Sequence, residues 1–230
     1  MKLTPELLKI FAPFKALGDG ALAAIAADCS VQHYDDGELV IGHTDTSVDV
    51  LLLVSGAARV SLYSADGQRV GFIELPRGMM FGEISAIDGL PRSASVEASE
   101  ASIIARLPRR RFLALMEDNP AFAIAVAQQL AGHVRRLTTR VFEFSTMAVR
   151  QRLRAELLRL AKPAASGDTG VIASLPTHAE LASRISTHRE AVSRELAWLD
   201  DGGFVVKQGR NLLIPSLGKL RSLMEDGWKG

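Results

Sequence analysis

The segment from Phe81 to Val96 carries side chains that are suited to holding an anion. Gly82 permits a close approach of the backbone, and N–H groups at the start of a following helix form an anion site that the helix dipole strengthens. Arg92 can pair with a phosphate through two parallel hydrogen bonds, and Ser93 can donate a third. The segment therefore predicts a strand ending at Gly82, a short helix, and a second strand beginning near Arg92.

The carboxylate of Glu83 indicates what else such a ligand would contain. A carboxylate accepts hydrogen bonds from hydroxyl groups, so Glu83 suits a ribose 2′-OH next to the phosphate. One arginine fits a monoanionic cyclic phosphodiester better than a triphosphate, and the sequence has no P-loop lysine motif. The alternative is an internal Glu83–Arg92 salt bridge that only folds the loop.

Two further motifs predict a helix-turn-helix near the C-terminus. The segments Thr177–Glu180 and, ten residues later, Thr187–Glu190 have the spacing of a capping box, in which the threonine caps a helix and the glutamate reaches back. They predict two short helices, the first running to about Arg184, with a tight turn around Ile185–Ser186.

The first turns of the second helix are expected to meet base edges in the major groove. Arginine can bond guanine O6 and N7 together, and glutamate can accept from cytosine N4. The segment Phe204–Ile214 predicts a hairpin turning at Gln208–Gly209, a wing on which Lys207 would touch phosphates together with Arg210. The alternative is a solvated charged face. The candidate DNA-binding residues are Thr177, His188, Arg189, Glu190, Ser193, Arg194 and Arg210.

The region from about Gly37 to Leu107 is rich in β-strand patterns punctuated by glycine. Alternating runs such as Ala58–Tyr63 and Val70–Leu75 are separated by Asp66-Gly67, a strong hairpin signal because the turn requires positive φ. Several strands at this spacing indicate a small antiparallel barrel or roll. A few helical turns, at roughly residues 5–11 and 20–27, precede it.

A heptad pattern follows Asn119-Pro120 and predicts a long helix. Spacings of four and three residues alternate along an apolar seam made of Ala123, Ala127, Leu130, Val134, Leu137, Val141 and Phe144. We expect a parallel or near-parallel dimer seam, which makes the protein a two-fold homodimer. The alternative is a helix packed lengthwise on its own barrel, and the off-seam residues Phe122, Val126 and Gln129 let the helix face both barrel and partner.

A second helix at about residues 148–160 and a loop at 162–174 are expected before the helix-turn-helix. The expected domains are therefore residues 1–118, 119–147 and 148–230. Residues 1–147 carry 14 Lys and Arg against 17 Asp and Glu, and residues 148–230 carry 13 against 9. A basic C-terminal part on an acidic N-terminal part suits a DNA-binding module carried by a sensor.

Several classes of protein are disfavoured by the sequence. No apolar stretch is long enough to span a membrane, and the N-terminus lacks the apolar region of a secretion signal, so a cytoplasmic location is expected. Cys29 is the single cysteine and cannot form an internal disulfide or hold an iron–sulfur cluster alone. No nucleophile–base pair and no metal-ligand spacing are present, so neither an enzyme nor a metal site is expected.

These residues give the chain a resemblance to a known family. Over essentially its whole length the sequence resembles the cyclic AMP receptor protein, or catabolite activator, family of bacterial regulators. The Phe81–Val96 segment is similar to the family's phosphate-binding cassette, and Thr187–Arg194 is similar to its recognition helix. The resemblance implies an α+β fold with a jelly-roll-like cyclic-nucleotide-binding β-roll, a long dimerisation helix and a C-terminal winged helix-turn-helix.

The resemblance also implies a ligand and its contacts. It implies cAMP as an allosteric ligand, with no other cofactor, and places Glu83 on the ribose hydroxyl. The candidate ligand residues are Gly82, Glu83, Ile84, Arg92, Ser93, Thr138 and Thr139, with Arg92 and Ser93 on the phosphate and the two threonines near the base. Leu137 stands where cAMP-responsive members carry threonine, so cGMP is the alternative ligand.

The implied partners are double-stranded DNA, a second copy of the chain and RNA polymerase. Arg189, Glu190 and Arg194 match the family's base-reading residues and imply a palindromic TGTGA-like site. Ser186 stands in the turn where many relatives have glycine. Two alternatives stay open: a regulator that answers to another effector or to none, and a regulatory subunit that controls an enzyme through protein contacts.

Overall fold

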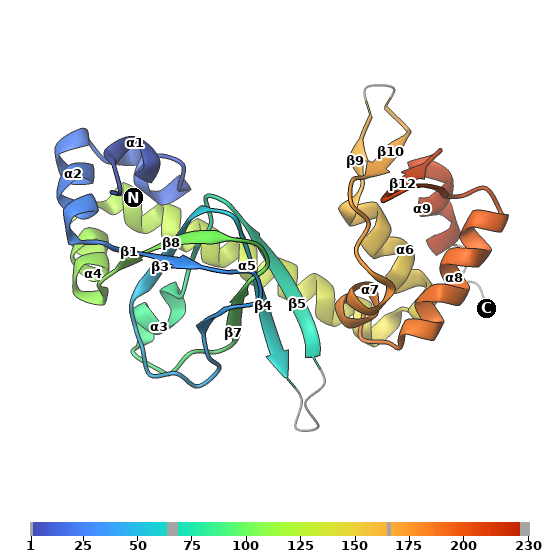
Figure 1. The fold of residues 1–230 in the computed structure, drawn as a ribbon, viewed down its shortest axis with the longest axis horizontal. Coiled ribbons are helices and arrows are strands. Elements are labelled where there is room, and N and C mark those ends of the chain that lie inside the picture. Colours follow the sequence, from blue (N-terminus) through green and yellow to red (C-terminus); the bar gives the residue numbers. More distant parts are fainter. Residues whose placement is uncertain (1, 64–68, 165–166, 226–230) are drawn as a thin grey trace. The chain divides into compact units, whose positions relative to one another are not determined.

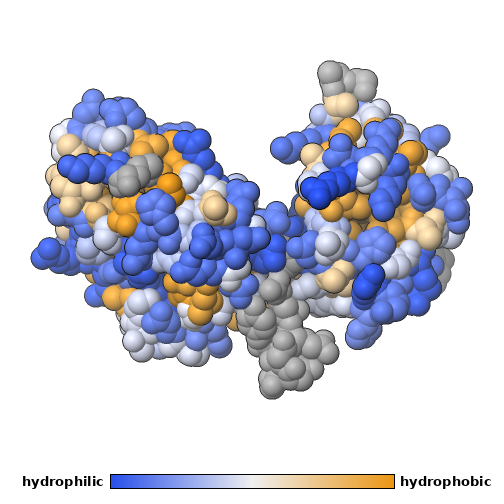
Figure 2. Space-filling model, viewed as in Figure 1, coloured by the Kyte–Doolittle hydropathy of each residue, from blue (hydrophilic) through white to orange (hydrophobic). Residues whose placement is uncertain are grey.

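The computed structural model describes residues 2–63, 69–164 and 167–225. The chain forms two compact units, Met1–Arg135 and Arg136–Gly230, and the long helix α5 (Pro120–Thr146) runs from one into the other (Figure 1). The faces seen in Figure 2 are mainly hydrophilic with separate apolar areas. In the described ranges no helix is long and apolar enough to cross a membrane.

The first unit contains the predicted β-roll. Its strands form two four-stranded antiparallel sheets, ordered β1-β8-β3-β6 and β2-β7-β4-β5. The roll starts earlier than expected, at Ser30, and the predicted Asp66-Gly67 turn lies outside the described residues. The strands are β1 (Ser30–Tyr34), β2 (Leu39–Ile41), β3 (Val50–Ser55), β4 (Ala57–Tyr63), β5 (Arg69–Pro76), β6 (Met80–Phe81), β7 (Ser95–Ala98) and β8 (Ser102–Leu107).

Strand β3 supplies apolar side chains to both sides of its sheet. Val50, Leu52 and Val54 belong to one buried cluster, and Leu51 and Leu53 belong to another. Successive side chains of a strand point to opposite faces, so a continuous apolar run predicts a strand that is covered on both faces. The roll is built around this strand.

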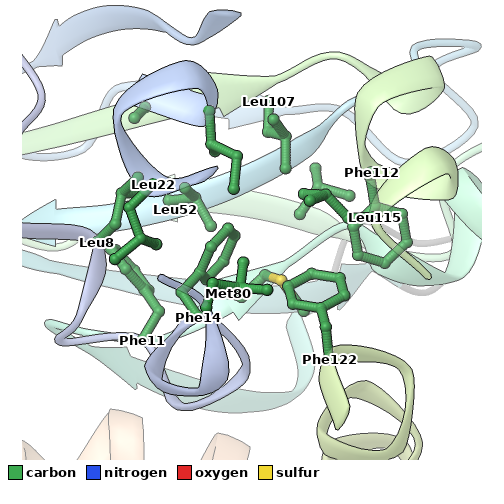
Figure 3. Close-up of a cluster of buried hydrophobic side chains, with 14 of the residues drawn as sticks. Leu8, Phe11, Phe14, Leu22, Leu52, Met80, Leu107, Phe112, Leu115 and Phe122 are labelled. Atoms are coloured by element: carbon green, nitrogen blue, oxygen red, sulfur yellow. The ribbon is translucent and has the colours of Figure 1, made fainter. Parts of the chain in front are cut away.

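Helices close one side of the roll and hold the start of α5. Phe122 of α5 packs edge-to-face on Phe14 and Phe112, with ring centroids 5.2 and 5.9 Å apart (Figure 3). Burying one such side chain contributes about 1.5–3 kcal/mol, and Val126 is also buried, so the off-seam face of α5 packs on the roll as expected. The helices are α1 (Pro5–Leu8), a 3-10 helix (Ala12–Ala16), α2 (Asp19–Asp28), α3 (Glu83–Asp88) and α4 (Arg109–Asp118), the last of which was not predicted.

The second unit contains the predicted winged helix-turn-helix. One apolar cluster joins its helices and includes Leu153, Leu181, Ile185, Val192 and Leu199. After the end of α5 its elements are α6 (Val149–Leu160), β9 (Lys162–Pro163), β10 (Gly170–Ile172), α7 (His178–Arg184), α8 (Arg189–Asp201), β11 (Val206–Gln208), β12 (Asn211–Ile214) and α9 (Leu217–Glu225).

The expectation of a loop over residues 162–174 is wrong in part. Strand β10 pairs with both β9 and β12, which gives a four-stranded sheet ordered β11-β12-β10-β9. Proline and glycine make this segment look irregular, but Ile172 is buried in the core of the unit. The hydrogen bonds with β12 satisfy backbone groups that the wing alone would leave unpaired.

Candidate functional site

The predicted anion loop begins where β6 ends. Gly82 caps α3 with φ of +82°, in the left-handed region that favours glycine. A Cβ atom at Gly82 would lie 2.5 Å from Nη1 of Arg92, so a larger residue would displace that side chain. The next strand begins at Ser95 rather than near Arg92. The reason is that Arg92 N–H donates to Asp45 O (2.8 Å), which ties residue 92 to the segment before β3.

The guanidinium of Arg92 is buried and held on several sides. It donates from Nε to Ser47 Oγ (3.1 Å), from Nη1 to Gly82 O (3.0 Å) and from Nη2 to Asp49 O (2.7 Å). These bonds use three of its five N–H groups. Burial and then the charge of Arg106 lower the pKa of Arg92, yet an arginine keeps its charge in proteins. The loop thus offers a fixed positive charge.

The carboxylate of Glu83 is 2% exposed and lies beside α5. Its Oε1 is 3.5 Å from Nδ1 of His133. Burial raises the pKa of Glu83, while its own backbone N–H, Gln129 and Arg92 act in the opposite direction. Among the described residues, the basic side chain within 4 Å of this carboxylate is His133 and not Arg92, so the alternative of a direct Glu83–Arg92 salt bridge is not formed.

The structure brings Gly82, Glu83 and Arg92 together in one buried cluster. Ile84 and Ser93, which directly follow Glu83 and Arg92 in the sequence, are exposed. Thr138 and Thr139 are exposed on the part of α5 that belongs to the second unit, and their contact with a ligand stays a prediction.

Sequence reasoning missed several residues that support this cluster. Ser47 and Asp49 could not be found because no motif links them to a residue more than forty positions away. Arg109 ties the cluster together by donating from its N–H to Asp49 Oδ1 (3.1 Å) and from Nε to Ala86 O (2.8 Å). His133 could have been found, since it lies four residues after the off-seam Gln129 and therefore on the same face of α5.

The first capping box of the helix-turn-helix is confirmed. Glu180 N–H donates to Thr177 Oγ1 (3.2 Å), and Thr177 N–H donates to Glu180 Oε2 (2.9 Å). The capping oxygen satisfies an N–H group that the first turn of α7 leaves unpaired.

The second predicted capping box is wrong. Helix α8 begins at Arg189, and its N-cap is His188, which makes no side-chain capping bond. Thr187 N–H donates to Ala182 O (2.9 Å), so Thr187 still belongs to the turn that closes on α7. Ser186 adopts φ of +50° in this turn. Glycine would take this conformation without a steric cost.

The expected base-reading side chains lie on the exposed face of α8. His188, Arg189, Glu190 and Arg194 are exposed. Ser193 differs from them, because its Oγ donates to Arg189 O (3.1 Å) and lies 2.7 Å from Nδ1 of His178. This contact joins the start of α7 to the first turns of α8.

His178 is a polar residue that the sequence did not single out. Partial burial, followed by the positive charges of Lys207 and Arg189, lowers the pKa of His178. The wing turns at Gly209–Arg210, one residue later than predicted, with Gly209 at φ of +61°. Arg210 is exposed on this turn, where it is available to an anionic partner.

Comparison with known proteins gives matches for both units. Residues 31–119 match the profile of the cyclic nucleotide-binding domain, and residues 151–223 match that of the Crp-like helix-turn-helix domain. The cAMP-activated global transcriptional regulator CRP of Pasteurella multocida is 25% identical over 198 residues, which cover 85% of this chain and 95% of that protein.

Solved structures share the fold. FixK2 from Bradyrhizobium japonicum has a TM-score of 0.72 and 19% identity, with 85% of this chain and 96% of that chain covered. The catabolite activator protein of Thermus thermophilus has a TM-score of 0.53 and 27% identity, with 94% and 99% covered. The order of roll, long helix and winged helix-turn-helix is therefore shared along nearly the full length of these chains.

Proposed function

The chain belongs to the Crp/Fnr family of transcriptional regulators, with a cyclic nucleotide-binding domain and a DNA-binding domain, and from this premise we propose that cAMP controls its binding to DNA as a homodimer. The observation that carries the proposal is the buried cluster of Gly82, Glu83 and Arg92. It offers one cation and one carboxylate, which a cyclic phosphate and its neighbouring ribose hydroxyl would satisfy together.

The ligand contacts follow from that cluster. We assign the phosphate to Arg92 and Ser93, the ribose hydroxyl to Glu83, and the base to Thr138 or Thr139, and we keep Ile84 as a further ligand contact. Arg92 needs little reordering to meet an anion, because its guanidinium is already held by three acceptors. Curated relatives named as cAMP-activated favour cAMP, and cGMP is the alternative.

The DNA contacts belong to the second unit. Arg189, Glu190 and Arg194 would read base edges of a palindromic TGTGA-like site, each good contact being worth about 1–3 kcal/mol against a wrong base. Thr177, His188, Ser193 and Arg210 would meet or support contacts to the backbone phosphates.

The proposed dimer forms along α5, and RNA polymerase is its expected further partner. Val134, Leu137 and Val141 of the predicted seam are 56–64% exposed in the single chain. Exposed apolar residues in heptad register are typical of a helix that pairs with another copy. Nucleotide binding then shifts the dimer toward the arrangement that engages both half-sites, by as much as the ligand's affinities for the two arrangements differ.

The test compares Arg92→Ala with Arg77→Ala. Arg77 donates to Val54 O in the same roll (3.1 Å) and so controls for the loss of an arginine that bonds to a backbone carbonyl. We expect calorimetry to show that Arg92→Ala loses at least about tenfold in cAMP affinity, while Arg77→Ala keeps it. Fluorescence anisotropy of a TGTGA palindrome at a fixed, stated salt concentration should show cAMP stimulation in the wild type and in Arg77→Ala only.

Three outcomes would contradict the proposal in different ways. Equal cAMP affinity in both variants would remove Arg92 from the site. Tighter binding and stimulation by cGMP would replace the effector. Binding of cAMP without any change in the affinity for DNA would favour the alternative function, a regulatory subunit that controls an enzyme through protein contacts.

A further inference from the structure

A buried ionic cluster joins the last turns of α5 to the helix-turn-helix inside the second unit. Glu156 of α6 is 1% exposed and pairs with three arginines: Arg140 of α5 (2.7 Å), Arg159 of α6, and Arg184 (3.3 Å), which ends α7. Glu143 of α5 is a second buried carboxylate, 3.3 Å from Arg140 and 2.5 Å from Arg159. Three helices therefore share one set of charges.

A second series of contacts runs from the same end of α5 toward the same end of α7. The guanidinium carbon of Arg152 in α6 lies 5.3 Å from the centre of the Phe144 ring, a cation–π contact. Nη2 of Arg152 donates to Ser186 O (3.4 Å), and Ser186 is the left-handed residue of the turn. Both series of contacts start in the last two turns of α5, and both end at residues 184–186.

The chemistry of the cluster favours a few discrete arrangements over gradual adjustment. Removing one partner from a buried ion pair leaves the other charge desolvated and unpaired, which is strongly unfavourable. Arg184 is buried, so it cannot leave Glu156 for water without α7 moving as well. A shift in the last turns of α5 must therefore carry Glu156 and Arg184 with it or break a buried pair.

We propose that Arg140 and Glu143 are positioning residues for the helix-turn-helix, and that they transmit changes in α5 to the end of α7 through Glu156 and Arg184. The inference rests on the proposed function only for the source of the signal, the nucleotide. The link itself is a property of the second unit and can be tested without any ligand.

A second ion pair in the same unit serves as a matched control, because no residue of α5 takes part in it. Arg154 of α6 pairs with Glu195 of α8 (2.7 Å), donates to Leu223 O of α9 (2.8 Å) and lies 5.0 Å from the centre of the Trp198 ring. Both members of this pair are mostly buried. Glu195→Gln therefore breaks a comparable ion pair in the same unit without touching the route from α5.

The first measurement is amide hydrogen exchange on the full-length, ligand-free variants Glu143→Gln and Glu195→Gln. We expect Glu143→Gln to speed exchange at least about fivefold over residues 181–187 and to leave residues 196–201 unchanged. Glu195→Gln should speed exchange over residues 196–201 and leave residues 181–187 unchanged. Unchanged exchange in β3, residues 50–54, checks that the roll is intact. If Glu143→Gln does not fold, Arg140→Gln breaks the same link and is read in the same way.

The second measurement is the ratio of DNA affinities with and without saturating cAMP, from anisotropy of the TGTGA palindrome. We expect Glu143→Gln to lower this ratio at least about fivefold, the lower end of typical allosteric couplings, while Glu195→Gln keeps the wild-type ratio. Equal exchange over 181–187 in Glu143→Gln and wild type would overturn the inference even if cAMP stimulates DNA binding. Faster exchange there, in a protein whose wild type ignores cAMP, would support the inference and overturn the proposed effector.

Discussion

At the scale of single residues, the ligand site depends on how closely the chain can approach Arg92. Gly82 does two things at once, since it adopts a left-handed conformation and leaves room for Nη1 of Arg92. Asp49 and Ser47 also hold the guanidinium, by accepting from its Nη2 and Nε. The sequence revealed the glycine and the arginine, because their types are specific to anion binding. It did not reveal Asp49, because that residue meets Arg92 through a backbone carbonyl, which any residue type could supply.

Replacing Gly82 with alanine tests this double role against a glycine with the same φ. Gly37 also has φ of +82°, but a Cβ atom there would meet nothing within 4 Å. We expect Gly37→Ala to lower the free energy of unfolding by up to about 1.5 kcal/mol, with cAMP affinity unchanged. The left-handed conformation costs an L-residue about 1–2 kcal/mol, and alanine removes about 0.4–1 kcal/mol of freedom from the unfolded chain. Gly82→Ala should cost more and weaken cAMP binding at least about tenfold. Denaturant unfolding and calorimetry measure both, and equal behaviour of the variants would remove the steric argument.

Cys29 gives a prediction about pH. Burial, followed by the charge of Asp28, raises the pKa of Cys29 from 9.0 to about 12. At pH 8 the native thiolate fraction is then about one in ten thousand, so we expect reaction with a disulfide reagent to be about a thousandfold slower than in the unfolded chain.

The same shift fixes the sign of its effect on stability. The unfolded thiol loses its proton near pH 9 while the folded one keeps it, so the free energy of unfolding should fall as pH rises above about 9. Cys29→Ser lacks this contribution and serves as the reference. Comparable thiol reactivity in native and unfolded protein would show that burial does not protect Cys29.

At the scale of elements, periodic patterns predicted more than capping motifs did. Strand β4 and the off-seam face of α5 were found because alternation and heptad spacing are regular patterns in the sequence. Strands β9 and β10 were missed, since two or three residues are too few to show a period. The strand β12, which pairs with β10, lies about forty residues away. The second capping box failed because Thr187 bonds back to Ala182 instead of starting α8.

The turn between α7 and α8 gives a prediction at this scale. Ser186 holds φ of +50°, which costs an L-residue about 1–2 kcal/mol, while glycine adds about 0.4–1 kcal/mol of freedom to the unfolded chain. We therefore expect Ser186→Gly to raise the free energy of unfolding by up to about 1 kcal/mol, and Ser186→Val to lower it by a similar amount or more. Denaturant unfolding decides the sign, and a destabilised Ser186→Gly would contradict the steric reading of this turn.

At the scale of the whole molecule, α5 is the element that both units share. Its first turns are fixed by Phe122 and Val126 in the core of the roll, and its last turns enter the ionic cluster around Glu156. Between them lies the exposed seam that is proposed to pair with a second copy. A single chain leaves this seam in water, and the heptad register and the exposure of its residues together favour pairing with a second copy.

Two exposed apolar residues of α5 allow a matched test of the dimer. Leu137 is 56% exposed on the seam, and Ile124 is 58% exposed off it. We expect Leu137→Glu to weaken dimerisation at least about a hundredfold, because a charge would be buried at a coiled-coil position, and to weaken palindrome binding because two half-sites are no longer engaged together. Ile124→Glu should sediment like the wild type. Analytical ultracentrifugation would contradict the seam if both variants stayed dimeric.

The four-stranded sheet of the second unit has a consequence for how DNA would be released. The hairpin that bears Arg210 is hydrogen-bonded to β10, which is in turn hydrogen-bonded to β9. Strand β9 begins one residue after the end of α6. The hairpin therefore cannot move away from α6 without breaking the hydrogen bonds of this sheet. Phosphate contacts of the hairpin and base contacts of α8 would then be lost in one step. Dissociation from DNA should therefore follow a single exponential. No intermediate is expected in which the protein contacts only the phosphate backbone of the duplex.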